Sequence, residues 1–268
     1  MFLETVEKFG DTAALKADFL KKSFVKYIVS SMLAGIYVGF GIFLIFTIGG
    51  AFAAVESPAV KLLMGVSFGI ALTLVIVAGA ELFTGNHMVM TIGLFTRKVT
   101  FLQAFAVWGA SFLGNIIGSL FLAWMVAQTG LLQNPQTADF LNKVSSAKMN
   151  APFWDLFVRG VLCNMLVCLA VWMSARVKED TAKIFVIFWC LFAFITSGFE
   201  HSVANMSLLG MPLFSSHPDN VTWTGYIWNV LVVSLGNFVG GGIFIGAAYY
   251  LISSEGKKKQ IKGTANER

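Results

Sequence analysis

The sequence predicts an all-α polytopic membrane protein with six transmembrane helices arranged as an aquaporin-like 3+3 inverted repeat. First, hydrophobic residues make up 57% of the 268 residues and charged residues only 12%, which leaves too little charge to cover a soluble surface. Second, uncharged stretches such as 27–55 and 99–138 exceed the ~20 residues that span a bilayer. Third, two glutamate motifs and two Gly-Asn motifs recur at similar spacings.

The elements follow in order along the chain. In residues 1–26, apolar side chains recur at helical spacing between charges, which predicts an N-terminal interfacial helix, with a solvated tail as the alternative. The second and fifth apolar segments each contain a lone glutamate followed by a Gly- or Asn-containing stretch, so we expect both helices to be broken. The six segments are expected at 27–53, 60–95, 100–128, 155–176, 183–210 and 221–252.

The distribution of Lys and Arg predicts the orientation. Fifteen lie in the N-terminal segment, the 2–3 and 4–5 loops and the tail, whereas the opposite side holds Lys61, Lys143, Lys148 and Arg159, the last with Asp155 as its expected partner. Both termini should therefore be cytoplasmic in a plasma or inner membrane. The expected parts are a first repeat at 27–128, an extracytoplasmic connecting loop at 129–152, a second repeat at 153–252 and a basic cytoplasmic tail at 253–268.

The repeat can be read from short strings. ELFTGN at 81–86 and EHSVAN at 200–205 both read Glu, three residues, a small residue and Asn, 119 positions apart. The third and sixth segments carry GNIIG at 114–118 and GNFVG at 236–240. Since each half has three spans, the second half must be inverted relative to the first, and the two breaks meet near the middle of the membrane.

Charged groups at this depth cost at least ~2.5–3.5 kcal/mol and must be satisfied. We expect Glu81 and Glu200 to accept hydrogen bonds from backbone N–H groups freed at the breaks, with Asn86 and Asn205 completing the network. Direct contact of the glutamates with a permeating solute is the alternative. The glycines at four-residue spacing predict close helix packing.

His201 is the candidate for the pore. It follows Glu200 at one break, opposite the break that carries Thr84, and it lies near Asn164 if the fourth helix faces the pore. An imidazole exchanges protons near neutral pH, although a core histidine without such a role is the alternative. For His87 a surface or interhelical place is expected, with a position lining the cytoplasmic exit as the alternative. The three cysteines, Cys163, Cys168 and Cys190, are expected to be core residues, since their spacing suits neither a disulfide framework nor a zinc site.

The sequence resembles the formate/nitrite transporter family, and within it most the hydrosulfide and nitrite channel branches. The resemblance covers essentially the full chain, and the strings that match are AGIYVG at 34–39, ELFTGN at 81–86, GVLCNMLVCLAVW at 160–172 and GFEHSVANM at 198–206. The resemblance implies a homopentamer with one pore in each subunit, no cofactor or metal, and transport of small monovalent anions such as formate, nitrite or hydrosulfide.

The resemblance also implies the site residues. His201, Thr84 and Asn164 match the central polar site of the family. Leu82, with Phe83 nearby, matches the cytoplasmic constriction. The periplasmic constriction is matched by Phe68, Leu72 and Phe194.

An anion in a narrow apolar passage faces a large desolvation penalty, which protonation removes. We therefore expect Lys148 outside and Lys16 inside to attract the anion, with solvated loop charges as the alternative, and a proton relayed at His201 to let the neutral acid pass. Two other functions stay open: a pore for a neutral solute, and an intramembrane enzyme with a two-metal site built from Glu81, Glu200, His87 and His201. The sequence favours a channel that is not an enzyme.

Overall fold

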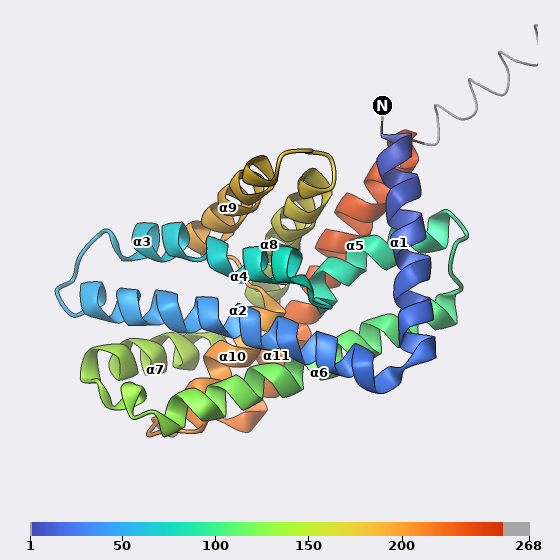
Figure 1. The fold of residues 1–268 in the computed structure, drawn as a ribbon. Helices are drawn as coiled ribbons and strands as arrows, with labels where there is room; N and C mark the ends of the chain where they lie inside the picture. Colours follow the sequence, from blue (N-terminus) through green and yellow to red (C-terminus); the bar gives the residue numbers. More distant parts are fainter. Residues whose placement is uncertain (1, 254–268) are drawn as a thin grey trace, which may run out of the picture.

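The computed structural model describes residues 2–253 and consists of helices (Figure 1). Within this range, six helices are long and apolar enough to cross a membrane, as the sequence predicts: Phe24–Ala53, Val60–Gly79, Phe101–Gln128, Phe153–Ser174, Asp180–Ser197 and Trp223–Ser253. The expected basic tail lies, apart from Ser253, outside the described residues.

The first half contains α2 (Phe24–Ala53), an interrupted second span made of α3 (Val60–Ser67), α4 (Gly69–Thr73) and η1 (Leu74–Gly79), then α5 (Phe83–Phe95) and α6 (Phe101–Gln128). The second half repeats this order with α8 (Phe153–Ser174), α9 (Asp180–Ser197), α10 (Ser202–Leu213), and α11 (Trp223–Phe238) continued by η3 (Val239–Ala247). η1 and η3 are π-helices.

The two predicted helix breaks are confirmed. In the second span the helix ends at Gly79 and resumes at Phe83, and in the fifth span it ends at Ser197 and resumes at Ser202. The break contains a left-handed glycine in each case, Gly79 with φ +86° and Gly198 with φ +76°. Only glycine adopts this conformation without steric cost, so the sequence itself stops both helices.

Glycines bring the helices of each half into close contact, as predicted. A Cβ atom at Gly118 of α6 would collide with the backbone carbonyl of Met32 in α2, and one at Gly240 would collide with the carbonyl of Val161 in α8. These contacts join the first and third spans of each half.

Two further helices lie at opposite ends of the bundle (Figure 1). α1 (Leu3–Lys22) forms the helix expected in residues 1–26 and packs on α5, where Gly93 leaves room for Ala13. At the other end, the segment expected as a connecting loop contains η2 (Leu131–Gln133) and α7 (Pro135–Met149). α7 is a helix because Asn134 caps its first turn and Pro135 occupies its first position.

Candidate functional site

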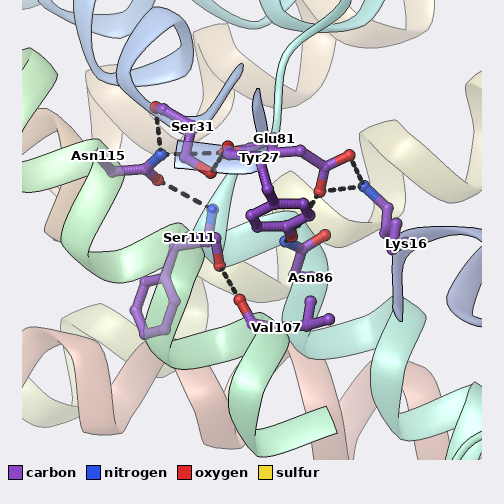
Figure 2. Close-up of polar contacts among 9 residues, drawn as sticks. Lys16, Tyr27, Ser31, Glu81, Asn86, Val107, Ser111 and Asn115 are labelled. Carbon is purple, nitrogen blue, oxygen red and sulfur yellow. Dashed lines mark hydrogen bonds and ion pairs between the residues drawn. The ribbon is translucent and has the colours of Figure 1, made fainter. Parts of the chain in front are cut away.

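The two breaks are held by equivalent asparagines. Asn115 of α6 accepts the Phe83 N–H at 2.9 Å and donates to the carbonyls of Ser31 at 2.7 Å and Glu81 at 2.9 Å (Figure 2). In the second half, Asn237 of α11 accepts the Ser202 N–H at 2.9 Å and donates to the carbonyls of Gly160 at 2.8 Å and Glu200 at 3.0 Å. The inverted repeat therefore extends to individual hydrogen bonds, and the unwound backbone is satisfied by amide side chains.

This arrangement corrects the expected role of the glutamates. Freed backbone N–H groups at the breaks donate to Asn115 and Asn237, not to Glu81 and Glu200. The Glu81 carboxylate instead accepts from Lys16 of α1, at 2.7 Å to each oxygen, from the Tyr27 hydroxyl at 2.9 Å and from Asn86 at 3.3 Å (Figure 2). The carboxylate thus forms charge-assisted hydrogen bonds with a lysine, and the neutral asparagine accepts the backbone N–H.

The second glutamate likewise has a lysine and an asparagine as partners. Lys148 of α7 donates to Glu200 at 2.6 Å, and Asn205 donates to it at 2.6 Å. The Glu200 side chain is 3% exposed and that of Lys148 is 20% exposed. The alternative in which Lys16 and Lys148 are solvated loop charges is therefore wrong, because each lysine forms a largely buried ion pair with the glutamate of one break.

His201 lies at the N-cap of α10, where its side chain has two distinct contacts. Its Nδ1 accepts the Ala204 N–H at 3.1 Å, and its Nε2 lies 2.8 Å from the Thr84 hydroxyl oxygen. Since Nδ1 accepts a hydrogen bond, the proton of the neutral ring is assigned to Nε2, which donates to Thr84. The imidazole of one break thus contacts the first turn of the helix that follows the other break.

The equivalent N-cap in the first half is Leu82, 119 positions earlier, which has no side-chain cap bond. Leu82 and His201 line one small cavity of about 10 Å³ together with Phe68, Leu72 and Phe194. This volume holds about one water molecule. This cavity is therefore small and almost wholly apolar, with the imidazole as its polar group.

A larger cavity of about 460 Å³ reaches the same place from the α7 end of the molecule, and we call it the outer cavity. Phe194 and His201 line its inner part, and Lys61 and Lys148 also line it. His201 lies between this opening and the small apolar cavity, since both cavities contact its ring. A solute that entered the outer cavity would meet the imidazole before Leu82.

Asn164 and Phe83 lie beside the central pair and do not contact the imidazole. The Asn164 amide nitrogen lies 2.7 Å from the Asn237 carbonyl, 3.1 Å from the Thr84 carbonyl and 3.2 Å from His87 Nδ1. It therefore holds Thr84 through its backbone. The Phe83 ring packs on His87, with centroids 4.4 Å apart, and does not line the small cavity. His87 is 1% exposed, which agrees with the expected interhelical place and excludes the expected surface place.

The four residues considered for a two-metal site do not converge. Glu81 and Glu200 each bind a lysine, and His201 and His87 bind Thr84 and Asn164. Across residues 2–253, no group of three His, Cys, Asp or Glu side chains could hold a metal ion. The expected Arg159–Asp155 contact is present at 3.5 Å on the exposed surface.

Sequence reasoning missed the roles of Asn115, Asn237 and Tyr27. The Gly-Asn strings that revealed the repeat contain both asparagines, and a buried amide in an apolar segment needs a partner. This requirement could have predicted that both asparagines form buried hydrogen bonds. Tyr27 gave none, because a tyrosine at a membrane boundary is also typical of an interfacial belt.

The family model for the formate/nitrite transporter matches residues 3–251, nearly the whole described chain. The chain belongs to the formate/nitrite transporter family. The nitrite transporter NirC of Salmonella typhimurium is 43% identical over 259 residues, which cover 96% of this chain and 94% of the relative. A probable formate transporter of Methanothermobacter thermautotrophicus is 38% identical over 243 residues, which cover 84% of this chain and 88% of the relative.

Solved structures of this family have the same fold. An FNT family ion channel superposes with a TM-score of 0.88 at 44% identity and covers 93% of this chain and 98% of its own. A pentameric formate channel with formate bound superposes with a TM-score of 0.74 at 29% identity, over 87% and 98% of the two chains. As a member of the family, the chain is a membrane transporter and not an enzyme.

Proposed function

We propose that this chain forms a channel for small monovalent anions of weak acids, namely nitrite, formate and hydrosulfide, and that His201 and Thr84 form its central site. The supporting observation is the His201–Thr84 hydrogen bond at 2.8 Å, which lies between an open cavity and an apolar passage with room for about one water. Relatives named as nitrite and formate transporters support the substrate class.

The apolar side chains explain why a proton is needed. Phe194 and Phe68 on one side and Leu82 on the other would remove most of the water around an anion, and no formal charge lines the small cavity. A bare anion there would lose its hydration without compensation, whereas the neutral acid loses little. We therefore propose that the anion is protonated at His201 and crosses the apolar passage as the neutral acid.

The geometry specifies what this proton relay requires. To give a proton from Nε2, the ring must first take one at Nδ1, which releases the Ala204 N–H that Nδ1 accepts. Thr84 accepts the Nε2–H and so fixes the orientation of the ring, and Asn164 fixes the Thr84 backbone. In this proposal, Phe68, Leu72, Phe194, Leu82 and the neighbouring Phe83 remain the two constrictions. Lys16 attracts anions at one end of the channel and Lys148 at the other. The ion pairs with Glu81 and Glu200 weaken this attraction.

We further propose a homopentamer with one pore in each subunit, because the formate channel of similar fold is pentameric. Cytoplasmic termini follow from the excess of basic residues on that side. We also propose the division of the chain that the sequence predicts, with 27–128 and 153–252 as the two repeats.

Swelling of proteoliposomes tests the substrate class. Purified channel should give rapid swelling in salts of formate, nitrite and hydrosulfide, and swelling in glycerol at the rate of empty liposomes. Rapid swelling in glycerol would favour the neutral-solute pore instead. Equal, slow swelling in all solutes would contradict both functions.

A further inference from the structure

The outer cavity contains two lysines with different surroundings. Lys148 donates to Glu200 at 2.6 Å, so the charge deep in the cavity is already balanced. Lys61, the second residue of α3, lines the same cavity nearer the surface and is exposed. Within residues 2–253, Lys61 has neither an ion pair nor a hydrogen bond through its ammonium group.

The rest of the cavity wall offers Lys61 no counter-charge. Its polar members besides the two lysines are neutral: Ser57, Asn205 and His201. Glu56 precedes Ser57 in the chain but does not line the cavity. The wall between Lys61 and His201 is otherwise apolar, with Phe194 and Ile195 among its members. A charge beside low-dielectric walls projects its field along the opening more strongly than one on an open surface.

We propose that Lys61 supplies most of the anion-attracting charge at this mouth of the channel, and that Lys148 mainly neutralises Glu200. This inference deepens the proposed anion-channel function and rests on it. Lys61 then acts on the rate at which anions enter the outer cavity, and it leaves the chemistry at His201 unchanged. Its effect depends on ionic strength, because salt screens an exposed charge within a Debye length, ~30 Å at about 0.01 M and ~3 Å at about 1 M.

Nitrite influx into proteoliposomes at these two ionic strengths tests the proposal. We expect Lys61→Gln to lower influx about two- to fivefold at low ionic strength and to match the unmodified protein at high ionic strength. Lys61→Arg, which keeps the charge, and Lys143→Gln, which removes a charge from α7 at a different cavity, should both match it throughout. Unchanged influx in Lys61→Gln at low ionic strength, or an equal loss at both, would overturn the proposal.

Cysteine modification gives a second, side-specific test. Lys61→Cys is treated from outside the vesicle with membrane-impermeant thiol reagents of either charge. A trimethylammonium adduct should restore influx and a sulfonate adduct should lower it further, whereas equal effects of the two would show a steric and not an electrostatic role. Cys163, Cys168 and Cys190 are buried, so the unsubstituted protein is the matched control. Absence of nitrite, formate and hydrosulfide flux in the unsubstituted protein would instead refute the proposed function.

Discussion

At the scale of residues, the proposed central site depends on departures from the internal symmetry. His201 and Leu82 occupy equivalent N-caps 119 positions apart, yet one is an imidazole and the other an aliphatic side chain. By the same spacing, Thr84 corresponds to Val203. Each polar member of the central pair therefore has an apolar counterpart. The repeat builds the frame, and these two departures from it supply the hydrogen-bonded pair of the proposed central site.

The N-cap role of His201 can be separated from its proposed transport role. His201→Asn keeps an acceptor for the Ala204 N–H, since Asn is among the best N-cap residues, whereas His201→Ala loses it at a cost of about 1 kcal/mol. We expect unfolding in detergent to show this difference in stability between the two variants. If the Asn variant is destabilised as much as the Ala variant, the cap contact does not stabilise α10.

The buried ion pair predicts an order of stabilities. Lys148→Met strands the Glu200 carboxylate, 3% exposed, and should cost about 3–5 kcal/mol. Glu200→Gln should cost less, because Lys148 lines the outer cavity and can reach water. The double variant should recover stability relative to Lys148→Met. Additive losses in a double-mutant cycle would contradict the pairing.

At the scale of elements, the breaks in the second and fifth spans could be predicted, but their supports could not. A lone glutamate next to Gly and Asn in an apolar run marks each break locally. Asn115, by contrast, acts on Phe83 and Ser31, 32 and 84 residues away, and nothing local in the sequence states that pairing. The π-helix η3 was also missed, since an added residue per turn changes apolar periodicity too little to detect.

The close contact between α2 and α6 gives a prediction with an internal control. Gly118→Ala places a Cβ against the Met32 backbone and should destabilise the protein by roughly 1–3 kcal/mol. On the same helix, Gly109→Ala meets no atom within 4 Å and should be neutral or slightly stabilising. Thermal unfolding in detergent compares the two. If both substitutions change the stability equally, helix propensity and not packing against Met32 determines the effect.

At the scale of the whole molecule, α1 and α7 have equivalent functions. Each helix precedes one half, and each sends a lysine to the glutamate of that half, Lys16 to Glu81 and Lys148 to Glu200. The two helices lie at opposite ends of the bundle, as an inverted repeat requires (Figure 1). The segment expected as a connecting loop is therefore the counterpart of the N-terminal helix, and each half consists of one such helix followed by three spans.

The equivalence of α1 and α7 could not be predicted from hydropathy alone. Six spans, their inverted order and the two breaks follow from apolar length and repeated strings. The helix at 135–149 is polar enough to resemble a loop, and its partnership with Glu200 depends on a fold that brings residues 52 positions apart into contact. Similarly, Asn164 was expected beside the imidazole, but the fold places its amide nitrogen against the Thr84 and Asn237 carbonyls and near His87 Nδ1.

The pH dependence of nitrite influx in His201→Asn and Thr84→Val proteoliposomes tests the central site most directly. Influx through the unsubstituted protein should rise as the pH falls, because proton delivery supports the neutral acid. Both variants should lower this influx by at least about a hundredfold, the lower end of the range for a lost general acid, and should remove its pH dependence. Wild-type rates and an unchanged pH profile in both variants would contradict the assignment of His201 and Thr84 to the anion pathway.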